Sequence, residues 1–154
     1  MDENSLETAL ADLGSLVASD TSEILGISRR KVLLFIEQGL VRPCNVEEVG
    51  RGRPRRLDLD GLQMMHIAVE LELLGYTPKY MKPILDLIES EGLWQSDQLF
   101  EIYSDRSGGF SVVEESRQYG ATMTLNIRLM AIELLFLVNT YRRKRESDKV
   151  QPLS

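Results

Sequence analysis

Glycine and proline divide the first half of the chain into short segments. Because both residues end helices, this half can form only short helices. Gly26 follows the apolar pair Ile24–Leu25, while Gly39 and Gly75 each follow a longer apolar run. A glycine directly after an apolar, helix-periodic run is a typical end signal for a helix. Pro43 adds a further stop, because proline disfavours the helical conformation of the residue before it. The sequence therefore predicts a mainly α-helical fold.

Capping residues mark where these helices begin. Ser28 can cap a helix over residues 28–38, and Asp58 or Asp60 can cap one that runs to about residue 74. In Thr77–Pro78, Thr suits the N-cap and Pro the first position of a helix to about residue 90. Pro83 conflicts with that helix, because proline removes a backbone donor, so we expect a kink or a later start.

The residues before the first glycine are less constrained. Leucines at positions 6, 10, 13 and 16 suit a short amphipathic helix, but Gly14 weakens it. Residues 1–15 are equally compatible with a mobile leader, and we treat them as one. The polar run Ser19–Glu23 offers several N-cap candidates for the helix that ends before Gly26.

Residues 91–154 have a different character. Phe110–Val113 is strand-like, and the apolar residues from Met123 to Leu129 alternate with polar ones, which predicts a half-buried strand. From about Leu129 a helix that is apolar on nearly every side runs to residue 141, where Arg142–Arg145 closes it. Such a helix must be buried, and a second chain is the expected cover. We interpret residues 91–154 as a dimerisation element that pairs through Leu129, Ile132, Leu135, Phe136 and Val138.

Basic residues are concentrated in one stretch of an otherwise acidic chain. The 154 residues carry a net charge of -6, yet residues 29–56 hold eight bases and three acids, a charge of +5. A local patch governs the choice of partner more than net charge does. The acidic total therefore does not exclude a nucleic-acid partner. The bases of this stretch are Arg29, Arg30, Lys31, Arg42, Arg51, Arg53, Arg55 and Arg56.

Four short motifs follow one another between residues 16 and 90. Ser22–Ser28 reads Ser-Glu-Ile-Leu-Gly-Ile-Ser, and Gly39–Pro43 reads Gly-Leu-Val-Arg-Pro. The arginine-rich segment Val49–Arg56 comes next, and two further predicted helices meet at Leu74–Thr77. This order resembles the DNA-binding domain of MerR-type regulators, in which a helix-turn-helix is followed by an Arg-bearing wing and two more helices. Leu33 departs from the family, whose recognition helix usually carries Arg at that place.

The resemblance implies a winged helix-turn-helix followed by two helices, in a transcriptional regulator that binds double-stranded DNA as a homodimer. Helix 28–38 would lie in the major groove, with its N-terminal residues nearest the bases. The wing would contact the phosphate backbone or enter the adjacent minor groove. The residues expected to contact DNA are Ser28, Arg29, Arg30, Lys31, Arg42, Arg51, Arg53, Arg55 and Arg56.

Other classes of function fit less well. The alternative is a protein-interaction adaptor that uses the same scaffold without sequence-specific DNA binding, and an effector or protein partner is left open. We expect no enzyme and no cofactor, because one His and one Cys leave no nucleophile–base pair. Thiolate or imidazole metal sites need several converging ligands, so Cys44 and His66 predict none.

The compartment follows from two absences in the sequence. No apolar run is long enough to span a bilayer, and the acidic start Met1–Asn4 does not resemble a secretory signal. We therefore expect a soluble, cytoplasmic protein with no membrane partner.

Overall fold

The computed structural model describes residues 8–9, 11, 14–45, 54–92, 99–104, 110–112 and 122–150. Within them the chain forms five helices and two small antiparallel sheets, one of two strands and one of three. The prediction of a mainly helical chain with small β elements is confirmed. None of the described helices is long and apolar enough to cross a membrane.

Two short helices, α2 (Ala18–Leu25) and α3 (Arg29–Glu37), are joined by a three-residue turn. Gly26 ends α2 with a left-handed backbone, φ 66°, which glycine adopts without steric cost. The hydroxyl of Ser22 donates to the carbonyl of Ile27 at 2.6 Å and fixes the turn from inside the helix. The helix over 28–38 is confirmed, with Ser28 as its N-cap.

The start of α2 differs from the prediction. Val17 is the N-cap, and the polar run Ser19–Glu23 lies inside the helix rather than before it. Asp20 takes over the capping role, because its Oδ2 accepts a hydrogen bond from the backbone N–H of Val17 at 3.2 Å. A carboxylate near a helix N-terminus also complements the helix dipole.

A two-stranded ribbon joins segments that lie far apart in the sequence. Strand β1 (Leu16–Val17) pairs antiparallel with β2 (Arg56–Leu57), with Leu16 opposite Leu57. Both leucines are buried in the core. The ribbon therefore ties the residue before α2 to the end of the arginine-rich segment. The arginine-rich segment predicted to form the wing can be followed only at its end, because residues 46–53 lie outside the described residues.

The next two helices begin where the sequence predicts. Helix α4 (Leu59–Leu73) is capped by Asp58, whose Oδ1 accepts the N–H of Gly61 at 2.9 Å. Helix α5 (Pro78–Glu91) has Thr77 as N-cap and proline in its first turn. The later start suggested for this helix is wrong, since Pro83 lies inside it. The buried apolar stripe of α5, which consists of Met81, Ile84, Leu85 and Ile88, offsets the missing backbone donor.

A three-stranded sheet precedes the last helix. Strands β3 (Leu99–Ser104), β4 (Phe110–Val112) and β5 (Thr122–Asn126) are ordered β4-β3-β5, all antiparallel. The strand-like pattern from residue 123 is confirmed as far as Asn126. There the Asn126 side chain accepts the N–H of Leu129 at 2.9 Å and starts helix α6 (Ile127–Val150). Ile127 and Leu129 are therefore helical, not part of the strand.

Helix α6 packs on its own chain with one face and is exposed on another. Leu134, Val138 and Tyr141 are buried beside Leu16 and Leu62 from the N-terminal half. Phe136, by contrast, is 71% exposed. Cover of this exposed face by a second chain stays a prediction. The helix also continues to Val150, so Arg142–Arg145 lies within it rather than at its end.

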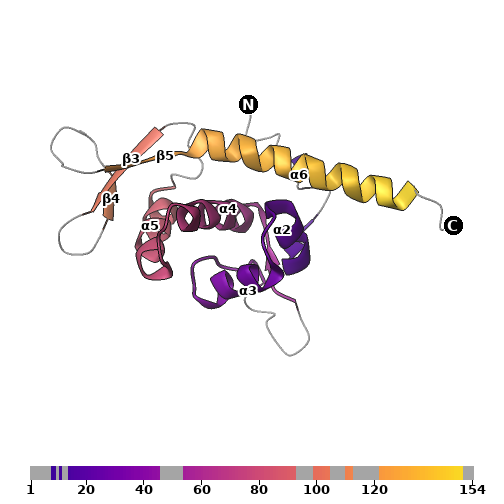
Figure 1. Ribbon diagram of the computed structural model, residues 1–154, viewed down its shortest axis with the longest axis horizontal. Coiled ribbons are helices and arrows are strands. Elements are labelled where there is room, and N and C mark those ends of the chain that lie inside the picture. The colour runs from indigo at the N-terminus through magenta and orange to yellow at the C-terminus, as the bar shows by residue number, and fades with distance from the viewer. Residues whose placement is uncertain are drawn as a thin grey trace.

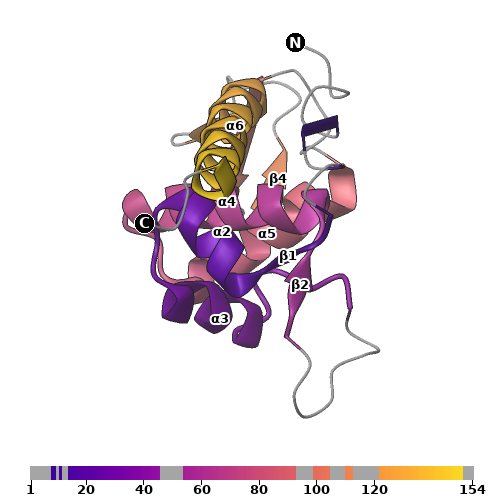
Figure 2. The same ribbon diagram turned by 90° about the vertical axis from the view of Figure 1, so that its right-hand side faces the viewer.

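The helices form layers. In Figure 1, α6 runs along one side of the molecule, α4 lies beneath it, and α3 lies on the far side of α4. The view turned by 90° again shows α6 and α3 at opposite ends, with the β1–β2 ribbon on the side of α3 (Figure 2). The surfaces made by α3 and by α6 therefore lie on opposite sides of the molecule.

Candidate nucleic-acid interface

The first turn of α3 holds three cations and no acid. The hydroxyl of Ser28 accepts the backbone N–H of Lys31 at 3.1 Å, which satisfies one of the free donors of that turn. Positive side chains at a helix N-terminus oppose the helix dipole, at a typical cost of about 0.3–1 kcal/mol each. No described residue forms an ion pair with Arg29 or Arg30 that would offset this cost.

Lys31 is bound within the chain. Its ammonium group pairs with the Glu72 carboxylate on α4 and lies 5.7 Å from the centroid of the Phe35 ring. Both charged side chains are only about one third exposed, at 35% and 39%. Although Lys31 was expected to contact DNA, this ion pair directs it towards α4 and gives it a role in holding α3 on α4.

Arg29 and Arg30 are exposed and carry the remaining charge of this turn. Neither forms an ion pair or hydrogen bond with any residue that the structure describes. Ser28 and Arg42 are exposed as well. These side chains are therefore accessible to a ligand from solution.

The two ends of the arginine-rich segment are held together at their base. Asn45 accepts the backbone N–H of Arg56 at 2.9 Å and donates its amide to the carbonyl of Pro54, also at 2.9 Å. The backbone N–H of Cys44 donates to the carbonyl of Arg56 at 2.8 Å. These bonds hold Cys44 and Asn45 next to Pro54 and Arg56, so the two described ends of the segment lie side by side.

The predicted arginines of this segment divide into three groups. Arg56 is half-buried, and its guanidinium donates to the carbonyl and hydroxyl oxygens of Ser15 at 3.3 and 3.4 Å. It therefore supports the ribbon. Arg55 is half-exposed next to it. Arg51 and Arg53 lie outside the described residues, so their expected DNA contacts stay predictions.

Sequence reasoning did not single out Asn45 or Glu72. Asn45 lies two residues after Pro43, and asparagine is favoured in turns because its amide bonds nearby backbone. This preference for turns could have indicated Asn45 from the sequence alone. Glu72 lies 41 residues from Lys31, and no local pattern indicates a contact of that range.

The predicted dimerisation residues all lie on α6 but differ in how exposed they are. Leu129, Ile132 and Phe136 are exposed and follow a spacing of three and four residues, which places them on one face of the helix. Leu135 is half-buried. Val138 is fully buried against its own chain, so packing within the chain accounts for its apolar character.

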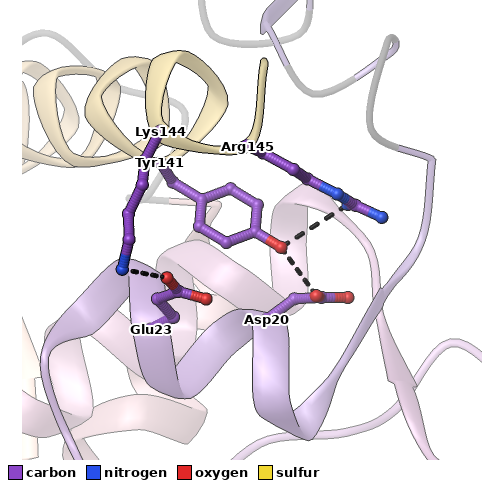
Figure 3. Close-up of polar contacts among 5 residues, drawn as sticks. All are labelled: Asp20, Glu23, Tyr141, Lys144 and Arg145. Atoms are coloured by element: carbon purple, nitrogen blue, oxygen red, sulfur yellow. Dashed lines mark hydrogen bonds and ion pairs between the residues drawn. The ribbon is translucent and has the colours of Figure 1, made fainter. Parts of the chain in front are cut away.

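The second half of α6 is attached to α2 by polar contacts (Figure 3). The Tyr141 hydroxyl donates to Asp20 Oδ1 at 2.7 Å, and Lys144 pairs with Glu23 at 2.8 Å. Burial, together with the hydrogen bond to the Asp20 carboxylate, raises the pKa of Tyr141 to about 12. The hydrogen bond to Glu23 raises the pKa of Lys144. These contacts anchor α6 to the first described helix.

No protein-family model and no curated protein sequence matches the chain.

Proposed function

We propose that the chain is a DNA-binding transcriptional regulator of the MerR type that binds duplex DNA as a homodimer through a winged helix-turn-helix. In this proposal α2 and α3 form the helix-turn-helix, the segment between Asn45 and Arg56 forms the wing, and α4 and α5 are the two helices that follow it. The order of motifs along the sequence and the order of the described helices both support this assignment.

The observation that carries the proposal is the pair Arg29 and Arg30. They stand in the first turn of α3, where cations are unfavourable, and they are exposed without a partner among the described residues. A phosphate backbone would remove the repulsion between these cations and the helix dipole. Phosphate contacts fix the position of the protein, while contacts to base edges specify sequence.

Lys31 has a supporting role in this proposal rather than a direct one. Its pairing with Glu72 fixes the rotation of α3 about its axis relative to α4. The orientation of a recognition helix decides which side chains reach the groove. Asn45 similarly fixes the base of the wing.

The face of α6 formed by Leu129, Ile132 and Phe136 supports the homodimer. Exposed apolar residues in a contiguous stripe mark an interaction surface more often than isolated ones do. A symmetric dimer would present two α3 helices to two half-sites of a palindromic operator. Light scattering on the purified chain should give a dimer, and Phe136→Ser should shift the population towards monomer. A strict monomer for the native chain would contradict this part of the proposal.

The proposal is tested by the salt dependence of binding to random duplex DNA. Neutralising roughly 5–7 phosphates gives a log–log slope of about -4.5 to -6. The double variant Arg29→Ala with Arg30→Ala should reduce the magnitude of this slope by roughly 2. The matched control is Arg128→Ala with Arg143→Ala, which removes two exposed arginines from α6 and should leave the slope unchanged.

The failure of this test has a clear meaning. Absence of binding at low salt would exclude the regulator and favour the protein-interaction adaptor. Equal slopes for the two double variants would show that binding does not involve the first turn of α3. A selection of bound duplexes from a random pool would then establish the operator, and a recovered palindrome would establish dimer symmetry.

A further inference from the structure

The only histidine of the chain faces two carboxylates at the contact between α4 and α6. His66 lies on α4, and Glu70 lies one turn later on the same helix, at the spacing that puts two side chains on one face. Glu133 comes from α6, which runs over α4 (Figure 1). The ligand atoms of these three residues all lie within 4.8 Å of one another.

His66 has a buried nitrogen without a hydrogen bond. The residue is 5% exposed, and its Nε2 makes no hydrogen bond with any described residue. An unsatisfied buried polar group costs about 1–3 kcal/mol, so such groups usually have a partner. Glu133 Oε2 lies 3.6 Å from this nitrogen, which is too far for a hydrogen bond but places a carboxylate directly in front of it.

We propose that His66, Glu70 and Glu133 form a binding site for a divalent transition-metal ion of the zinc type. One imidazole and two carboxylates are ligands that Zn²⁺ accepts, at metal–ligand distances of roughly 2.0–2.2 Å. Two ligands of one ion are therefore at most about 4.4 Å apart. The 3.6 Å separation of His66 and Glu133 already satisfies this limit. A mixed nitrogen and oxygen set does not suit Ca²⁺ or Mg²⁺, which prefer oxygen ligands alone.

Small movements would complete the site. His66 is fixed by the core, whereas the Glu70 side chain is half-exposed and that of Glu133 is 49% exposed. Both carboxylates can therefore change rotamer towards the imidazole without disturbing packing. The neutral imidazole is the form that binds metal. The open side of the site leaves the remaining coordination positions to water.

The site was not foreseen from the sequence, because Cys44 and His66 were the only thiolate and imidazole candidates. Carboxylate ligands are common on any surface, and Glu133 is 67 positions away from His66. The packing of α6 on α4 is what brings them together. The proposal does not depend on the DNA-binding proposal, since the three residues lie on the α4–α6 side of the molecule and not on α3.

The test is a titration of the full chain, freed of metal with a chelator, with ZnCl₂. Binding is followed by calorimetry and by the ¹H–¹⁵N resonances of the imidazole, which are unambiguous because the chain has a single histidine. We expect one ion per chain and a shift of the His66 ring resonances. Glu133→Gln and Glu70→Gln should each weaken binding at least about tenfold.

Glu146→Gln is the matched control, because it removes an exposed carboxylate from the same helix α6 outside the cluster. It should bind Zn²⁺ as the native chain does. Circular dichroism on each variant separates loss of the site from loss of the fold, and the exposure of Glu133 makes its variant a mild one. No binding, binding that leaves the His66 resonances unshifted, or equal affinity in native chain and both site variants would overturn the proposal.

Discussion

The cations of α3 and those of α6 differ in what they contact. In the second half of α6, Lys144 pairs with Glu23, and the guanidinium of Arg145 lies 3.5 Å from the Tyr141 hydroxyl. In the first turn of α3, Arg29 and Arg30 form no ion pair or hydrogen bond with a described residue. Both groups look alike in the sequence, as short runs of Arg and Lys. Their surroundings in the structure distinguish them: the cations of α6 hold the fold together, whereas Arg29 and Arg30 are available to a partner.

The comparison predicts its largest effect at α3. Replacing Arg29 and Arg30 together with Glu should lower affinity for duplex DNA by about 100-fold or more at low salt, since two phosphate contacts become two repulsions. The same change should leave the fold intact or stabilise it by about 0.3–1 kcal/mol per residue, because acids suit a helix N-terminus. Fluorescence anisotropy measures the affinity for DNA, and urea unfolding measures the stability of the fold. Loss of both binding and stability would show that these arginines serve the fold.

The second prediction concerns Tyr141. Tyr141→Phe removes the hydrogen bond to Asp20 and should lower the free energy of unfolding by about 1.5–3 kcal/mol, a range typical for a bond to a charged group. Urea unfolding at neutral pH measures this loss. DNA affinity of the folded variant should be unchanged, which would separate α6 from the proposed interface. A variant as stable as the native chain would mean that this bond contributes nothing net.

The same residue predicts a response to alkaline pH. The pKa of Tyr141 is raised to about 12 in the folded chain, from an ordinary value of 10.0. Its neutral form is therefore favoured by folding, so its contribution is fully present below pH 10 and is lost as the pH rises from 10 through about 12. Ultraviolet absorbance should show one tyrosine that ionises later than the others. Tyr141→Phe should lack this late step, and its persistence in the variant would assign it elsewhere.

The smallest effect is expected at Lys144. Lys144→Gln breaks an ion pair between side chains that are 64% and 48% exposed, where solvent screens most of the attraction. The melting temperature should change less than in Tyr141→Phe. A larger change would mean that the α2–α6 contact depends on charge rather than on the buried phenol.

Local signals in the sequence predicted most of the helices. Ser28, Asp58 and Thr77–Pro78 mark helix starts because capping depends on neighbouring residues only, and the glycines after α2 and α4 act through their own backbone. Contacts over long separations were not predictable in this way. The pairing of Leu16 with Leu57 involves strands of two residues, which carry no periodicity to recognise.

The errors around α6 have physical reasons. Arg142–Arg145 was taken as the end of the helix, since cations suit a C-terminus, yet arginine and lysine also favour helix interiors. Lys144 and Arg145 then find partners on α2, and the helix continues to Val150. Val138 was assigned to a second chain because no pattern tells which apolar side chain of a helix finds cover within its own chain.

The candidate site residues were predictable only in part, because local charge patterns do not show contacts made through the tertiary fold. The exposed pair Arg29 and Arg30 could be identified from charge and the position of Ser28 alone. The engagement of Lys31 with Glu72, and of Arg56 with Ser15, depends on the tertiary fold. Charge patterning identifies a basic region, and only packing shows which of its members are already bound.

The carboxylate of Asp20 accepts two hydrogen bonds, one at the start of α2 and one that joins α2 to α6. One oxygen receives the N–H of Val17 at the start of α2, and the other receives the phenol of Tyr141 from α6. A ¹³C label on the side-chain carboxyl carbon of Asp20 would therefore report on both hydrogen bonds in an NMR spectrum. Its chemical shift would register the fraying of α2 and the release of α6, although the bonded residues lie more than a hundred positions apart in the chain.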